Sequence, residues 1–253
     1  MVDKNFIFLS SMPRAGNTVI GSIINSNKNV KCTANSILTT VIYELLKLKK
    51  SNYFINFPDH QSYNNILKNL LNIYYKDWDC KLIIERSAWG TEFNLNYLDA
   101  VFKEQKFLIL WRPVLECLAS FIKLNLNNFL KNEEDIRNYI KNLMDKERGT
   151  IGVQLQSMRN IIKYKKNNKI IYYKDFANNP KSFFSDLSSF IKFDITIPDK
   201  IDQFTINNVN YDDESLGQKK LHLIKKGPIK EELYDIEKYV PKDIIDKYKN
   251  ESF

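Results

Sequence analysis

A loop close to the N-terminus carries the residues best suited to binding an anion. Residues 10–18 read SSMPRAGNT and lie between a short apolar run and a segment with helical spacing. Small residues let the backbone wrap closely around an anion, and the N–H groups and dipole at a helix start favour negative charge. We therefore predict a phosphate-binding loop at this position. Its binding residues are Arg14, Ala15, Gly16, Asn17 and Thr18.

This loop differs from the Walker A motif of ATP-hydrolysing proteins. The first Gly of that motif is missing, and Asn17 stands where the motif has its Lys. The motif's Lys reaches the β- and γ-phosphates, so its absence argues against ordinary ATP hydrolysis. A plain strand-to-helix connection punctuated by Pro13 and Gly16 is the alternative interpretation. The combination of Pro, Arg, Gly and Thr at this junction favours a functional loop.

A second cluster follows another apolar run in the middle of the chain. Arg112 comes directly after the run Lys106–Trp111, and Ser120 lies eight residues further on in a segment with helical spacing. A guanidinium group is a planar fork suited to phosphate, and a hydroxyl two helical turns later can add a second hydrogen bond. An arginine at a strand end with an incidental helix serine is the alternative. Together with the first loop, the pair predicts a second phosphate site.

The elements that must position these residues alternate between strand and helix patterns. Segments with helical spacing begin near Val19, Ile37, Ile66, Leu115 and Phe183. Between them lie continuous apolar runs, typical of strands buried on both faces of a parallel sheet. These runs are Phe6–Ser10, Lys81–Glu85, Lys106–Trp111 and Lys169–Tyr173. The alternation predicts an α/β fold of three layers, in which helices flank a central parallel sheet.

Nothing in the chain predicts a division into domains. Residues 133–167 form a mostly helical insertion, and residues 198–229 read as irregular, so we expect a loop-rich C-terminal part. No repeat and no linker composition separates these segments from the rest. We therefore predict one domain over residues 1–253.

Composition restricts the class of protein and of partner. The sequence is 43% hydrophobic and carries a net charge of +8, so it can bury a core and favours anionic partners. No apolar run approaches the roughly 20 residues that cross a bilayer, and we expect no membrane partner. Nucleic acid is a weaker expectation, because no finger spacing or aromatic RNA-binding signature accompanies the charge. Cys32, Cys80 and Cys117 predict free thiols, and with no signal segment they predict a cytoplasmic protein without a metal site.

Three motifs together resemble the sulfotransferase family. The loop Pro13–Thr18 resembles that family's 5′-phosphosulfate loop, with Asn17 in place of the first Thr of a PRxGTT-like sequence. Arg112 and Ser120, with Glu116 between them, are similar to the family's 3′-phosphate pattern. The third motif is similar to the family's YEDL…P segment, whose tyrosine contacts the nucleotide in some members. It reads Tyr173-Lys174-Asp175-Phe176, followed by Pro180, and the three motifs occur in family order.

The resemblance implies a P-loop-like α/β fold and a specific cosubstrate. Such a protein binds 3′-phosphoadenosine 5′-phosphosulfate (PAPS), transfers its sulfuryl group to a hydroxyl or amine without a metal, and releases 3′-phosphoadenosine 5′-phosphate (PAP). A basic, Gly-containing segment near the C-terminus resembles the part of the family that closes over the 3′-phosphate; a solvated basic turn is the alternative. The resemblance thus adds Tyr173, Lys225, Lys226 and Gly227 to the predicted nucleotide-binding residues.

Catalysis of this transfer needs positive charge on the leaving oxygen and on the sulfuryl oxygens. Arg14 lies in the predicted loop and is the first candidate. Arg86 is the second, because it follows the run Lys81–Glu85 at a place where family members often carry Lys or Arg. An ion pair between Arg86 and Glu85 at the strand end is the alternative.

Catalysis also needs a base for the acceptor proton. Val30-Lys31-Cys32 resembles a turn after which the tyrosine-modifying sulfotransferases carry an acidic base, but residues 33–35 read TAN. The remaining candidates are His60 beside Asp59, then Glu85, and more remotely Glu44. We predict His60 as the base. A solvated loop histidine next to a helix cap is the alternative.

The sequence therefore predicts a sulfotransferase with an unidentified small-molecule, glycan or peptide acceptor. One alternative is a small-molecule kinase with a degenerate phosphate loop, although such an enzyme needs a metal-holding Asp where this chain has Trp111 and Arg112. The other is a protein that binds a nucleotide or anionic glycan without catalysis. An aromatic-rich region could line an acceptor cleft or simply pack in the core. It includes Tyr53, Phe54, Phe57, Tyr63, Tyr74 and Tyr75.

Overall fold

The computed structural model describes residues 4–126, 128–206, 209–214 and 221–253. Its centre is a parallel sheet of five strands in the order β2-β3-β1-β4-β5. A small antiparallel pair, β6 and β7, lies in the C-terminal part. The strands are β1 (Asn5–Ser11), β2 (Val30–Cys32), β3 (Leu82–Arg86), β4 (Phe107–Trp111), β5 (Asn168–Tyr172), β6 (Thr205–Ile206) and β7 (Val209–Asn210).

Helices fill the connections between the strands of the sheet. Their apolar spacing in the sequence gives each longer helix one face that packs on the core. The helices of the described segments are α1 (Asn17–Asn25), α2 (Leu38–Leu48), α3 (Asn52–Asn56), α4 (His60–Tyr74), α5 (Glu92–Val101), α6 (Val114–Asn125), α7 (Glu133–Leu143), α8 (Gly152–Tyr164), α9 (Tyr173–Asn178), α10 (Pro180–Ile191), α11 (Ile236–Tyr239) and α12 (Lys242–Tyr248).

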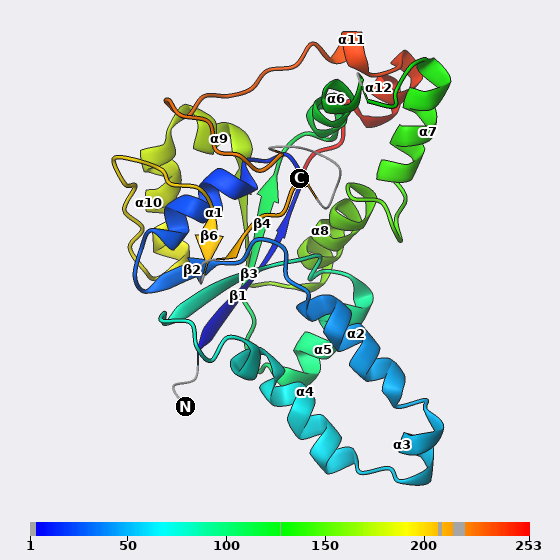
Figure 1. Ribbon diagram of the computed structural model, residues 1–253, viewed down its shortest axis with the longest axis vertical. Coiled ribbons are helices and arrows are strands. Elements are labelled where there is room, and N and C mark those ends of the chain that lie inside the picture. The colour runs from blue at the N-terminus through cyan, green and yellow to red at the C-terminus, as the bar shows by residue number, and fades with distance from the viewer. Residues whose placement is uncertain (1–3, 127, 207–208, 215–220) are drawn as a thin grey trace.

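The helices form layers on both sides of the sheet. Figure 1 shows α1, α9 and α10 over one face, and α5 and α8 over the other. Parallel strands need crossover connections, and right-handed crossovers place a helix on one face or the other according to the direction of the step. The predicted three-layer α/β fold with a central parallel sheet is confirmed, as are the helical insertion and the loop-rich C-terminal part.

The centre of the sheet fixes where a ligand can bind. β1 lies between β3 and β4, and Leu9 is level with Arg86 on one side and Leu108 on the other. The chain leaves β1 towards β2 and later returns to add β4 and β5 on the opposite side. Parallel sheets bind ligands where the order reverses in this way, at the carboxyl ends of the strands. The loops that follow β1, β3 and β4 open at this edge.

Some elements differ from those that the sequence predicts. β2 has only three residues and lies where the sequence resembles a turn, and β6 and β7 lie in the segment predicted to be irregular. Strands this short carry no readable periodicity. Cys32 and Cys117 are buried free thiols, and Cys80 is a half-buried one, as predicted. Among the described residues, the helices are all too short or too polar to cross a membrane.

Candidate functional site

The loop after β1 has an unusual backbone that leaves a helix start open. Arg14 has φ 63°, a left-handed conformation that few residues other than glycine adopt, and Gly16 has φ 74°. Gly16 is the N-cap of α1 and no side chain of the described residues caps this helix. A Cβ atom at Gly16 would lie 3.3 Å from the ring of Tyr173. The free N–H groups of the first turn therefore remain available to an anion.

Two buried polar atoms beside the loop lack hydrogen-bond partners in the described part of the chain. They are Ser11 Oγ, at the end of β1, and Asn17 Oδ1, at the start of α1. The Asn17 amide nitrogen is occupied, because it donates to the Met12 carbonyl at 2.8 Å. An unpaired buried polar group costs about 1–3 kcal/mol. The loop thus has the donors, the charge and the unmet hydrogen bonds of a site for a polar ligand.

Arg14 connects the two clusters that the sequence predicted separately. Its Nε donates to Ser120 Oγ on α6 at 3.2 Å. Tyr234 donates its hydroxyl to the same oxygen at 3.0 Å. The loop after β1 and the helix after β4 therefore lie side by side. This follows because β1 and β4 are adjacent parallel strands whose carboxyl ends lie at the same edge of the sheet.

Arg112 lies beneath this connection and is only 2% exposed. Its Nε donates to Glu116 at 2.9 Å, its Nη1 to the carbonyl oxygen of Arg14, and its Nη2 to the carbonyl oxygen of Glu232 at 2.8 Å. The guanidinium carbon lies 4.1 Å from the centre of the Tyr173 ring. Arg112 therefore holds the strained Arg14 backbone in place. An anion could reach it only if Glu232 moved.

A segment near the C-terminus covers this part of the site, and we call residues 228–234 the strap. The backbone N–H of Glu232 donates to the Tyr173 hydroxyl at 3.2 Å. Figure 1 shows the strap crossing from the side of α9 towards α11. Sequence reasoning missed Glu232 and Tyr234, because no local pattern connects them with residues more than 100 positions earlier.

The predicted segment Lys225–Gly227 lies immediately before the strap. All three residues are exposed, and Gly227 has φ 123° with open space around it. No interaction between these residues and Arg112 is found in the described residues. Their place in the chain puts them beside the strap, where a movement of the strap would carry them as well.

Arg86 is brought to the other side of the loop. Its backbone N–H donates to Thr33 Oγ1 at 2.7 Å. Burial raises the pKa of Tyr211, and the nearby Arg86 and Thr18 side chains act in the opposite direction. The Tyr211 hydroxyl is nevertheless buried without a hydrogen-bond partner among the described residues. Arg86 and Tyr211 thus lie close to the start of α1, opposite the Arg112 side.

A histidine that sequence reasoning did not select lies next to Tyr211. The rings of Tyr211 and His222 stack with centroids 3.9 Å apart and planes 8° apart. His222 Nδ1 lies 2.5 Å from Asp213 Oδ1, and the His222 backbone N–H donates to the other oxygen at 2.8 Å. Although burial acts in the opposite direction, these hydrogen bonds hold the pKa of Asp213 below its ordinary value. The carboxylate orients the ring and leaves Nε2 for other chemistry.

The structure does not bring His60 to the loop. His60 is the first residue of α4, is exposed, and meets the ring of Phe54 edge-on at 5.1 Å. Asp59 caps the helix by accepting from the backbone of Ser62 at 3.0 Å. Figure 1 shows this end of α4 beside α3 at the bottom of the view, while α1 lies beside the sheet and α6 near the top. The described contacts of His60 do not include the loop after β1, so the structure favours the alternative interpretation of a solvated histidine beside a helix cap.

The other acidic candidates are also placed by the structure. Glu85 is fully buried and accepts from the Tyr75 hydroxyl at 3.0 Å and from the Trp89 indole. It forms no ion pair with Arg86 in the described segments. Glu44 lies exposed on α2, paired with Lys47 at 3.1 Å. In the described part of the chain, neither carboxylate forms a hydrogen bond or an ion pair with the loop after β1.

Comparison with solved structures identifies the fold. The sulfotransferase domain from the curacin biosynthetic pathway matches with TM-score 0.55 and 14% identity, over 99% of this chain and 99% of that chain. The sulfotransferase domain of the Synechococcus PCC 7002 olefin synthase matches with TM-score 0.55 and 14% identity, over 100% and 90%. The chain has the sulfotransferase fold.

A third solved structure and the sequence comparisons complete this finding. A sulfotransferase from Alicyclobacillus acidocaldarius matches with TM-score 0.51 and 12% identity, over 85% of this chain and 90% of that chain. No protein-family model and no curated protein matches the sequence. The predicted P-loop-like fold is confirmed, and at these identities the likeness concerns the fold alone.

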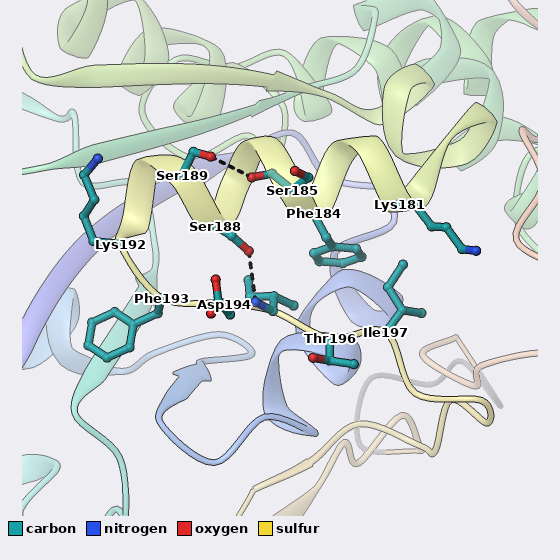
Figure 2. Close-up of a pocket in the computed structure, with 11 residues that line it drawn as sticks. Lys181, Phe184, Ser185, Ser188, Ser189, Lys192, Phe193, Asp194, Thr196 and Ile197 are labelled. Atoms are coloured by element: carbon teal, nitrogen blue, oxygen red, sulfur yellow. Dashed lines mark hydrogen bonds between the residues drawn. The ribbon is translucent and has the colours of Figure 1, made fainter.

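One groove of this sulfotransferase fold lies away from the loop. It has a volume of about 590 Å³ and lies between α10 and residues 193–197. The backbone N–H of Ile195 donates to Ser188 Oγ at 2.9 Å, and Figure 2 shows Ser188 pointing from α10 towards the segment that contains Asp194 and Thr196. The Thr196 backbone donates to Asn27 at 2.9 Å, so the groove adjoins the C-terminal end of α1. The loop after β1 lies at the other, N-terminal end of α1.

Proposed function

We propose that this protein transfers a sulfuryl group from PAPS to a hydroxyl or amine of an acceptor. The observation that carries the proposal is the hydrogen bond between Arg14 and Ser120. This hydrogen bond joins the uncapped start of α1 to the polar and charged groups around α6, so that the two lie in one site. A nucleotide with phosphates at both ends of its ribose needs two such positions side by side.

The loop after β1 would hold the 5′-phosphosulfate end. The first-turn N–H groups of α1 and the unpaired Ser11 Oγ supply hydrogen bonds. Arg14 and Arg86 supply positive charge from opposite sides, one from the loop and one from the end of β3. Bound PAPS supplies the sulfuryl group and a phosphate leaving group. The two arginines stabilise the charge that the transfer places on these oxygens.

The residues around α6 would hold the 3′-phosphate end once the strap has moved away from Arg112. Ser120 is hydrogen-bonded to Arg14 and so lies beside the loop. The Tyr173 ring contacts both Gly16 and Arg112. Arg112 becomes available when the carbonyl oxygen of Glu232 moves away from it. Lys225, Lys226 and Gly227 would close over the phosphate in the same movement of the chain.

We assign the role of base to His222 in place of His60. His222 is oriented by Asp213 and stacks on Tyr211, whose hydroxyl lies near Arg86 and Thr18. A histidine held through one nitrogen by a carboxylate can accept a proton at the other. In this role Nε2 takes the proton of the acceptor hydroxyl, and Asp213 stabilises the resulting positive ring.

Calorimetric titration of the full chain tests the proposal. PAP is titrated beside ATP with Mg²⁺, and the expected result is saturable binding of PAP and none of Mg-ATP. Arg14→Ala should weaken PAP binding, and Arg137→Ala is the matched control, because Arg137 is an exposed arginine on α7 paired with Glu133 and Asp243. Preference for Mg-ATP would favour the kinase alternative. Binding of PAP without transfer to any acceptor would favour a non-catalytic nucleotide-binding protein.

We also propose that residues 1–253 act as a single domain. The core cluster extends from Ile7 to Val240, and Phe253 packs against it. The strap joins residues after position 228 to the loop after β1 through Arg112. Removal of the C-terminal part would therefore expose the core and part of the proposed site together.

A further inference from the structure

A second cavity lies beside Arg86, and the nucleotide site described above does not use it. Its volume is about 530 Å³, within the range of small-molecule sites. One wall comes from the end of α4 and the turn after it, with Tyr74, Tyr75 and Trp78. The opposite wall comes from the β6–β7 region, and Phe204 and Val209 belong to it.

One end of this cavity meets the proposed site of transfer. Thr33 and Tyr211 both line it. Thr33 accepts the backbone N–H of Arg86 at 2.7 Å. The buried hydroxyl of Tyr211, which has no hydrogen-bond partner in the described segments, lies near the side chains of Arg86 and Thr18. A molecule in the cavity could therefore present one group to the sulfuryl position.

Aromatic and apolar side chains make up most of the walls of the cavity, and polar ones make up the rest. The Tyr75 ring meets the Tyr74 ring at 4.8 Å and the Trp78 ring at 4.7 Å, both edge-on. The Tyr75 hydroxyl donates to buried Glu85, so Tyr75 presents mainly its ring to the cavity. Phe204 lies 5.5 Å from the ring of Tyr211. Such a wall binds flat or aliphatic ligand surface by burial and edge-to-face contact.

The charges around the cavity narrow the ligand class further. None of the described residues that line it is Lys or Arg, and Asp212 is the acidic residue among them. Away from the end next to Arg86, an anionic group of an acceptor would lose its hydration without a cationic partner, which is costly. A sugar would bring many hydroxyl groups to a cavity in which rings and alkyl chains outnumber the polar side chains, which are Thr33, Asn35, Ser36, Asn210 and Asp212. Both classes are disfavoured by the same desolvation argument.

We propose that this cavity is the acceptor site and that it takes an uncharged, ring-bearing alcohol or phenol. The proposal rests on the proposed function. The acceptor oxygen forms the new bond to sulfur, and the bond from sulfur to the 5′-phosphate oxygen breaks, with its electron pair passing to the phosphate. The acceptor proton goes to His222 Nε2. Sulfated acceptor and PAP are the products.

The probe for the test is 2-naphthol, with methyl β-glucoside as the polar comparison. Binding of each to the full chain is measured by calorimetry, with and without saturating PAP. The decisive variant is Val209→Asp, which places a charge on the cavity wall at a residue that is 68% exposed, so that folding is not at risk. Ile55→Asp on α3 is the matched control, since Ile55 is 63% exposed and lies outside the cavity.

The expected result is saturable binding of 2-naphthol that Val209→Asp weakens at least tenfold and Ile55→Asp leaves within twofold. The affinity for PAP should stay unchanged in both variants. Equal 2-naphthol affinity in Val209→Asp, or equal binding of the glucoside, would overturn the proposal. If PAP fails to bind while 2-naphthol binding still depends on Val209, the proposed function fails and the acceptor role with it, although the cavity remains an aromatic ligand site. A second variant, Ala34→Trp, fills the cavity and should abolish 2-naphthol binding.

Discussion

The buried carboxyl group of Glu85 makes the stability of this protein depend on pH. It lies one residue before Arg86 and directly behind the cavity residue Tyr75. Burial raises the pKa of Glu85 from 4.5 to about 7. Because the folded pKa lies above the unfolded one, the contribution of this group is complete below about pH 4.5 and is lost as the pH rises through 7. The difference between the two pKa values corresponds to on the order of 3 kcal/mol.

The perturbation that isolates this effect is Glu85→Gln. The amide oxygen can accept from the Trp89 indole, and the amide nitrogen can donate to the Tyr75 oxygen, so the variant imitates the protonated acid. Glu44→Gln on the exposed face of α2 is the matched control. Between pH 4.5 and pH 8, wild type should lose on the order of 3 kcal/mol of unfolding free energy relative to Glu85→Gln.

Urea unfolding at these two pH values measures the difference directly. The slope against urea concentration should be the same for wild type and both variants, so that a shift of the midpoint reports stability. Glu44→Gln should follow the pH dependence of wild type. Parallel pH dependences for wild type and Glu85→Gln would refute the reasoning, because they would mean that Glu85 is ionised or solvated in the folded state.

Three further changes test the proposed site. Arg14→Ala should abolish sulfuryl transfer and weaken PAP binding at least tenfold, and full activity of this variant in a transfer assay with labelled PAPS would contradict the assignment. Arg112→Lys keeps the charge but loses the planar fork. The affinity for PAP relative to AMP, which lacks the 3′-phosphate, should therefore fall about tenfold when measured by calorimetry. An unchanged ratio would mean that Arg112 does not bind the 3′-phosphate. His222→Asn should lower kcat at least a hundredfold and flatten the pH profile of kcat while PAP affinity stays the same; a wild-type profile would place the base elsewhere.

A change in the strap should strengthen PAP binding, whereas the changes at Arg14 and Arg112 should weaken it. Tyr234→Phe removes the hydrogen bond to Ser120, which contributes about 1 kcal/mol to the covered state. If the strap must leave Arg112 before PAP binds, this variant should bind PAP up to about fivefold more tightly. Calorimetry at one temperature decides the matter, and weaker binding would show that the strap is part of the bound state.

The strands and the loops that follow them could be predicted from the sequence for a simple reason. β1, β3, β4 and β5 are each a continuous apolar run, and a run of this kind is buried on both faces of a sheet wherever it lies. Arg14 and Arg112 follow such runs directly. Their positions at the sheet edge therefore follow from local sequence, as does the uncapped start of α1 behind Gly16.

The partners of these residues depended on packing between distant segments. Arg14 meets Ser120 across 106 positions, and Arg112 meets Glu232 across 120. His60 has a chemically plausible neighbour in Asp59, yet α4 carries it away from the sheet edge. Nothing local distinguishes it from His222, whose carboxylate partner lies nine positions earlier in an irregular segment.

The sequence by itself determined that the chain makes a parallel sheet with a glycine-containing loop between its first strand and its first helix, because burial and backbone freedom are local properties of short segments. Only the tertiary structure decided which histidine packs on Tyr211, which segment covers Arg112 and which residues line the cavity beside Arg86. Those choices depend on how the helices pack over the two faces of the sheet, and packing sums contacts from the whole chain.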